Sequence, residues 1–306
     1  MDLKATIREA WDFAQEEKTM MYWYAFLPAL ISTIAGIIYI AYQAINFKRY
    51  FAHEQGVIGD LIQAAWQFVS SNPTLLPIIL GLAVVIAILY LLYPSYCEGA
   101  LIQLIARRHN GQEIKMSQGI IFGAKTFFPF LEFNGLLSFF SLSALLGYAT
   151  IILRTLGPDI LKFMSIFFIL VAVLSVVMSF LFSYAQYFMA IDHDGVFSAI
   201  GKSTNLVVTN WHSTFLVVLL LLLIGLRVIV NLILIIVIPS LILLVAGFFA
   251  SIALTYIGNI LAVIFVLAGL FLAGYLGGIM SVFSHAVWTL TFLKLTSDGE
   301  LSARDS

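Results

Sequence analysis

The longest uncharged stretch constrains this sequence more than any other feature. Residues 228–293 are 66 consecutive positions without Asp, Glu, Lys or Arg. A transmembrane helix needs about 20 predominantly apolar residues to cross roughly 30 Å of hydrocarbon. The rest of the chain has a similar character, since 62% of all residues are apolar and 10% are charged, against about 25% charged in soluble domains. The sequence therefore predicts an integral membrane protein and excludes a soluble enzyme.

Apolar runs of spanning length predict an all-α, polytopic bundle of about six transmembrane helices. The runs cover approximately residues 22–45, 74–93, 129–153, 160–190, 211–238 and 259–293. The second is expected to continue as a helix to Arg107-Arg108, with a kink at Pro94, because proline removes a helical hydrogen bond. Segment 240–257 is either a seventh helix or a re-entrant or interfacial helix. We favour a re-entrant or interfacial helix, because the segment has only 18 residues and no flanking charges.

The distribution of Lys and Arg predicts the orientation of the chain. With six spans, ten of the 15 basic residues fall on one side, four fall on the other, and Arg227 lies within a span. Cytoplasmic loops of membrane proteins carry the excess of Lys and Arg. We therefore expect a multi-pass protein of the cell (inner) membrane with both termini in the cytoplasm.

Three short amphipathic stretches precede the first, third and fifth predicted spans. They are residues 3–17, 117–128 and 195–209, and their apolar residues recur at helical spacing. Such helices are expected to lie in the membrane interface with the apolar side toward the acyl chains. The single membrane domain of residues 1–306 is then either three parallel repeats, at about 1–108, 115–191 and 195–294, or a bundle with amphipathic connectors that arose by chance.

The third amphipathic stretch carries a resemblance. Asp192-His193-Asp194-Gly195 is followed by Ala199, Ser203, Asn210 and Trp211. This pattern, over residues 185–215, resembles a recurrent segment of bacterial six-span membrane proteins of uncharacterised function. Among these are relatives of the membrane domain fused to some glycerophosphodiester phosphodiesterases. The resemblance implies an integral membrane bundle and brings no activity, because the catalytic barrel of those phosphodiesterases is a separate soluble domain.

Arg227 is the most unusual residue of the predicted spans. It follows His212 by 15 residues, which is about 22 Å along a helix, and Asn231 lies one turn further on. An ionisable residue at such a depth faces the bundle interior in most membrane proteins. We predict an intramembrane polar cluster of Arg227 and Asn231 with Glu98 or Glu132 as the counter-charge. The pair would fix the helix register, or it would mark a polar pathway or a lipid head-group site. Alternatively, Arg227 extends its side chain to the outer interface.

Other residues predict packing rather than chemistry. Gly274 and Gly278 form a G-x-x-x-G pair, which permits close helix contact within or between chains. The run Asp192-His193-Asp194 has no further ligand nearby in the sequence and indicates a solvated loop, while His285 suits a hydrogen-bonded packing residue or a proton relay. We expect no metal site and no cofactor, since the single cysteine and the absence of nucleotide or hydrolase motifs exclude the common patterns.

These observations predict a non-catalytic membrane protein rather than an enzyme. The preferred hypothesis is a membrane scaffold, or a module that binds lipid or a partner protein through its interfacial helices and basic residues. The alternative is a small transporter or channel-like protein that uses the polar face around Arg227. Membrane lipids, a protein partner or a second copy of the chain are the expected partners. Nucleic acid is excluded because the net charge is only −1.

Overall fold

The computed structural model describes residues 3–52, 67, 71, 76–227, 229 and 255–304. Within these ranges the chain is almost entirely helical and contains no β-strand. Five of the described helices are long and apolar enough to cross a membrane, and a sixth crossing exists if one bent pair is counted as a span. The structure therefore confirms an all-α, polytopic membrane bundle.

The N-terminal part begins with the predicted amphipathic helix and continues into the first span. Its elements are α1 (Leu3–Glu16), α2 (Lys18–Met21), the π-helical turn η1 (Tyr22–Phe26) and α3 (Leu27–Ala52). Ala10 and Ala14 of α1 are buried against the protein. The small side chains on this stripe let α1 pack closely against the C-terminal helix.

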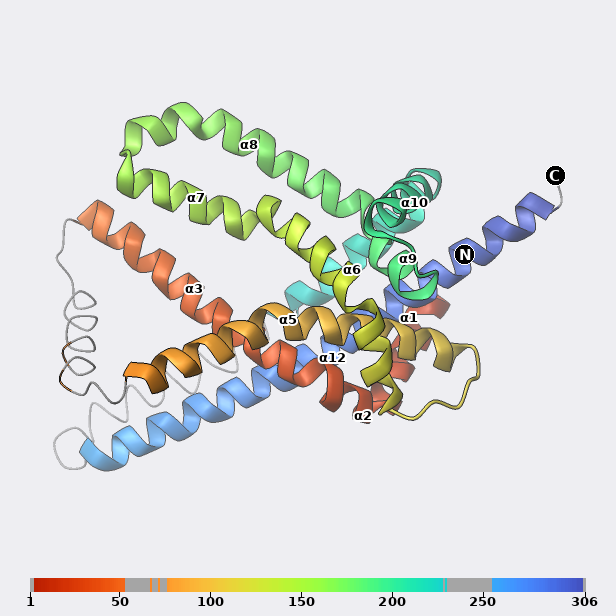
Figure 1. Ribbon diagram of the computed structural model, residues 1–306, viewed down its shortest axis with the longest axis horizontal. Helices are drawn as coiled ribbons and strands as arrows, with labels where there is room; N and C mark the ends of the chain where they lie inside the picture. The colour runs from red at the N-terminus through yellow and green to blue at the C-terminus, as the bar shows by residue number, and fades with distance from the viewer. Residues whose placement is uncertain are drawn as a thin grey trace.

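The second and third spans form a tightly packed pair. α5 runs from Leu76 to His109 with Pro94 inside it, and α6 runs from Gln118 to Phe140. A Cβ atom placed at Gly123 would lie 2.7 Å from the backbone oxygen of Tyr96, so glycine is required for α6 to approach α5 this closely. In Figure 1, α5 changes direction part-way along its length, as expected for a helix that contains proline.

The third span differs from its predicted boundaries. Residues 117–128 were expected to form a separate interfacial helix before a span at 129–153, but α6 joins both parts in one helix. The break falls instead at Ser141, whose backbone is extended. Its hydroxyl accepts a hydrogen bond from the N–H of Ala144 and so starts α7 (Leu142–Thr155), because serine is a favourable N-cap.

The C-terminal half continues through four further helices and a final long one. They are α8 (Pro158–Leu181), α9 (Ala185–Ile191), α10 (Val196–Thr209), the helix Trp211–Arg227 and α12 (Thr255–Arg304). Gly157 has a φ of 89°, which glycine adopts without strain, and allows the turn between α7 and α8. α10 and the helix Trp211–Arg227 are bent by 97° relative to each other. Residues 240–254, most of the segment whose membrane position was left open, lie outside the described residues.

The buried core lies toward one end of the bundle. One cluster of buried residues joins α1, α2, η1, the second half of α5 and α12, and another joins α6, α9, α10 and α12. Figure 1 shows both termini, the α5–α6 loop and α10 at this end, and the α7–α8 turn at the opposite end. The first half of α5 and most of α8 are exposed, as expected for helix surfaces that contact lipid.

The amphipathic helices use their apolar faces differently from the prediction. In α10 the predicted face is represented by Val196, Ala199, Ser203 and Val207, which are buried in the second core cluster. The matching face of α1 packs against α12. These faces therefore contact protein for the most part, since α10 packs against α8, α9 and α6, while Trp11 on the predicted face of α1 stays exposed.

Candidate ligand-binding pocket

A break between α8 and α9 creates the wall of a polar pocket. The Ser203 hydroxyl of α10 donates a hydrogen bond to the Leu181 carbonyl over 2.8 Å and accepts one from the Tyr184 N–H over 3.0 Å. It thus satisfies backbone groups on both sides of the turn that ends α8. Because the chain restarts as α9 beyond this turn, Gln186 and Tyr187 reach α5 and α12.

Glu98 of α5 lies at the centre of a hydrogen-bond network in this pocket. Its Oε2 atom accepts hydrogen bonds from Asn134 Nδ2 at 3.1 Å and from Gln186 Nε2 at 3.4 Å. Gln186 Nε2 also donates to Asn134 Oδ1 at 3.2 Å, and Asn134 Nδ2 donates to Ser95 Oγ at 3.0 Å. Three helices, α5, α6 and α9, are therefore joined by polar side chains among otherwise apolar neighbours.

The network borders a cavity of about 310 Å³. The lining residues come from α5, from the α8–α9 turn with α9, and from α12: Glu98, Ser183, Gln186, Tyr187, Ser284, His285 and Trp288. His285 Nδ1 lies 2.8 Å from the Ser281 carbonyl oxygen. A carbonyl only accepts, so Nδ1 donates this hydrogen bond and Nε2 is the ring atom left to the cavity.

The pocket lies between helices that are candidate membrane spans, Leu76–His109, Pro158–Ile191 and Leu267–Ser297. Glu98 precedes His109, at the end of α5, by 11 residues, and His285 precedes Lys294 by nine. At the helical rise these separations are about 16 Å and 14 Å along the two helix axes. Polar and ionisable side chains at such a depth are costly unless they are satisfied, and they mark functional sites in many membrane proteins.

The predicted cluster around Arg227 is not assembled in the described structure. Arg227 is exposed, Glu132 is exposed, and the described residues contain no ion pair between Arg227 and either Glu98 or Glu132. Asn231 lies outside the described residues. Of the four candidates, Glu98 is the residue that enters a polar network, and its partners are amides rather than an arginine.

The residues that surround Glu98 were not among those predicted from the sequence. Asn134 and Gln186 lie inside predicted spans and could have been found as isolated amides in apolar surroundings. Their proximity to Glu98 could not have been predicted, because the three residues belong to different helices and come together only when α9 turns toward α5. His285 was considered as a packing residue or a proton relay, and the structure places it in the lining of the cavity.

The two predicted packing glycines lie in α12 near α3. A Cβ atom at Gly274 would lie 3.1 Å from Leu30 Cβ and 3.3 Å from Phe26 Cε2, so this glycine permits a close contact within the chain. Gly278 is buried one turn further along. The contact at Gly274 is therefore one between helices of the same molecule.

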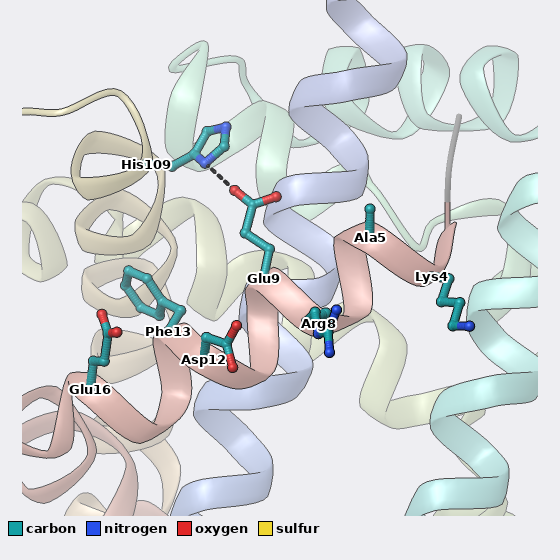
Figure 2. A pocket seen from close by; sticks show the side chains of 8 residues that line it. All are labelled: Lys4, Ala5, Arg8, Glu9, Asp12, Phe13, Glu16 and His109. Carbon is teal, nitrogen blue, oxygen red and sulfur yellow. Dashed lines mark ion pairs between the residues drawn. The ribbon is translucent and has the colours of Figure 1, made fainter.

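A second hollow, of about 930 Å³, lies along the polar face of α1. Its lining includes Lys4, Arg8, Asp12 and Glu16, charges of both signs. Figure 2 shows Glu9 directed toward His109, 2.9 Å away, while Lys4 points away from both. The second oxygen of Glu9 lies 3.0 Å from Lys294 Nζ.

These ion pairs attach α1 to the ends of α5 and α12. A further pair joins Arg108 Nη2 to Glu17 at 2.7 Å. Because the charges that line this hollow are of both signs and largely balance, it is less suited than the polar pocket to select a ligand.

The Asp192-His193-Asp194 run forms the loop that was expected. His193 has a φ of 58°, and Asp194 accepts a hydrogen bond from Lys202 Nζ at 2.7 Å. This hydrogen bond raises the pKa of Lys202. Among the described residues there is no group of three or more His, Cys, Asp or Glu side chains that could hold a metal ion.

Comparison of the chain with protein-family models, with curated proteins and with solved structures found no match. The resemblance of residues 185–215 to bacterial six-span proteins therefore stays a prediction. The pocket around Glu98 is the feature from which function has to be argued.

Proposed function

We propose that this protein is a non-catalytic integral membrane protein that binds an amphipathic ligand, such as a membrane lipid, in the pocket around Glu98. The observation that carries the proposal is a cavity between candidate membrane spans that is bordered by the carboxylate of Glu98 and the amide of Gln186. Polar and ionisable side chains are rare inside a membrane, and where they occur they commonly mark a functional site. A volume of about 310 Å³ lies at the lower end of ligand pockets.

The orientation belongs to the same proposal. The bundle end that holds both termini, the α5–α6 loop and α10 (Figure 1) also carries most of the basic residues. This asymmetry supports an inner-membrane protein with cytoplasmic termini. The pocket then opens in the inner half of the bilayer. The charged face of α1 is available there to a protein partner or a second copy of the chain.

A pocket-filling substitution tests the proposal. Ser284 lines the cavity, so Ser284→Trp should occupy its volume and exclude the ligand. Native mass spectrometry of the purified protein, before and after incubation with a total lipid extract, should show bound lipid on the wild type and much less on this variant. Ser165→Trp is the matched control, because Ser165 is an exposed residue of α8. A folded Ser284→Trp protein with the lipid complement of the wild type would contradict the proposal.

One observation favours transport as a second candidate function. Glu98 and His285 are both ionisable and line the same intramembrane cavity, an arrangement that also occurs in proton relays of transporters. Transport would then use this pocket rather than the face around Arg227. Protein-dependent proton flux into vesicles that contain the purified chain, lost in the Ser284→Trp variant, would favour this alternative over binding alone.

A further inference from the structure

Among the described residues that line the polar pocket, Glu98 is the only carboxylate, and no described cation pairs with it. Oε2 accepts two amide N–H groups, whereas no side chain or backbone group among the described residues donates to Oε1. No Lys, Arg or His of the described part forms an ion pair with Glu98. An ionised carboxylate in apolar surroundings is costly unless a positive charge compensates it. A bound cation would supply this compensation.

Two further polar groups of the cavity offer acceptors, while the hydroxyls of Tyr187 and Ser284 and the indole N–H of Trp288 are donors. The Ser183 hydroxyl donates to the carbonyls of Ser179 and Phe180, which leaves its oxygen free only to accept. The Gln186 amide nitrogen is used by Asn134 and Glu98, while its carbonyl oxygen has no donor among the described residues. A ligand that enters this cavity is therefore expected to supply N–H or O–H donors.

Aromatic side chains complete the lining. Tyr187 and Trp288 both border the cavity, and Trp288 is held edge-on against Tyr184, with ring centroids 5.3 Å apart. A cation close to an aromatic face gains further stabilisation. The carboxylate, the two acceptor oxygens of Ser183 and Gln186 and the aromatic rings together fit a positively charged donor, and the negative charge of Glu98 disfavours an anion.

The size of the cavity favours an organic cation over a metal ion as the ligand. A volume of about 310 Å³ far exceeds that of a bare ion. The described residues also provide no cluster of three or more His, Cys, Asp or Glu ligands. A primary ammonium group, with three N–H donors on one centre, matches both the acceptors and the space.

We propose that the pocket binds the primary ammonium group of an amine ligand, with Glu98 Oε1 as the counter-charge. This inference rests on the proposed ligand-binding function and names the chemistry of the ligand. The ammonium has two sources, the ethanolamine head group of a lipid or a soluble amine. The lipid would reach the pocket from the inner leaflet with its acyl chains along the exposed helix surfaces.

Glu98→Gln tests the proposal, because it keeps the shape of the side chain and removes the charge. Native mass spectrometry of the full-length protein in detergent would measure binding of dioleoyl phosphatidylethanolamine in one arm and of ethanolamine in another. Loss of one charged hydrogen bond should weaken binding about tenfold or more. The matched control is Glu132→Gln, which removes an exposed carboxylate of α6 and should leave binding within about twofold of the wild type.

Binding of the lipid alone identifies a head-group site, and comparable binding of free ethanolamine identifies a soluble amine. Failure of both ligands to bind the wild type, or equal binding to Glu98→Gln, would overturn the proposal. N-acetylated phosphatidylethanolamine keeps the test valid if Glu98→Gln does not fold. This lipid lacks the ammonium charge, and equal binding of it to the wild type would also overturn the proposal. Suppose that Ser284→Trp abolishes lipid binding but the wild type binds phosphatidylethanolamine and its N-acetylated form equally well. The lipid-binding function then stands, and the assignment of the ammonium group fails.

Discussion

At the scale of single residues, the Ser203 hydroxyl helps to determine the geometry of the pocket although Ser203 does not line it. Ser203 is fully buried and satisfies the Tyr184 N–H and the Leu181 carbonyl. Backbone groups left without partners in an apolar interior cost free energy. The turn between α8 and α9, and hence the position of Gln186 beside Glu98, depends on this side chain from a neighbouring helix.

Ser203→Ala should therefore destabilise the protein and loosen the pocket. Removing the hydroxyl leaves a buried N–H and a buried carbonyl with weaker partners, at a cost of about 1–3 kcal/mol. A thermal unfolding scan in detergent should show a lower midpoint. Asn205→Ala, at an exposed position of the same helix, is the control and should leave the midpoint unchanged or slightly raised. An unchanged midpoint for Ser203→Ala would mean that the turn is held by other contacts.

At the scale of elements, the α5–α6 pair holds two members of the polar network in register. Without side chains at Gly99 and Gly123 the helix backbones approach closely. A Cβ atom at Gly99 would overlap the Thr126 side chain, and one at Gly123 would meet the Tyr96 carbonyl oxygen. Close backbone approach at small residues is a common source of helix association in membranes. This contact brings Asn134 within hydrogen-bonding distance of Glu98.

Gly123→Ala should push α6 away from α5. The obstacle is a backbone oxygen, which cannot move aside as a flexible side chain can, and overpacking of this kind costs about 1–3 kcal/mol. The expected result is a lower unfolding midpoint in detergent together with weaker ligand binding. Gly135→Ala is the control on the same helix, since a Cβ atom at Gly135 would have nothing within 4 Å. It should be neutral or stabilising, because alanine favours the helix more than glycine does. Equal midpoints for the two variants would contradict this role of the α5–α6 contact.

At the scale of the whole molecule, the bundle has two unlike ends. At one end α1, α9 and α10 gather against the long helices, and the α7–α8 turn lies at the other end (Figure 1). Toward that turn α3, α5 and α8 expose apolar side chains. The ion pairs of α1 with the ends of α5 and α12 lie at the dense end. The pocket lies within this packed part, so its polar groups are held by protein on several sides.

Accessibility of engineered cysteines tests the proposed orientation. Cys97 is buried and would first be replaced in a Cys97→Ala background. In intact cells a membrane-impermeant maleimide should label the Leu156→Cys variant, in the α7–α8 turn, from outside. It should label the Gln112→Cys variant, in the α5–α6 loop, only after permeabilisation, because the basic end of the bundle faces the cytoplasm. The reverse pattern would overturn the orientation.

The sequence by itself determined the class of the protein and the approximate place of its helices. Apolar runs of spanning length predict all-α transmembrane structure because only helices of this composition satisfy their backbone within hydrocarbon. The amphipathic periodicity likewise located α1 and α10. Both are consequences of local pattern and need no knowledge of neighbouring elements.

Only the tertiary structure decided which polar residues meet and what the amphipathic faces contact. Asn134 and Gln186 are 36 and 88 residues from Glu98 in the chain, and their meeting depends on glycine contacts and on a turn held by Ser203. Charge alone suggested Arg227 as the partner of Glu98, yet the described arginine side chain is exposed. A hydrophobic pattern predicts that a helix face is buried, but it does not distinguish burial in lipid from burial in protein, because both environments suit apolar side chains equally well.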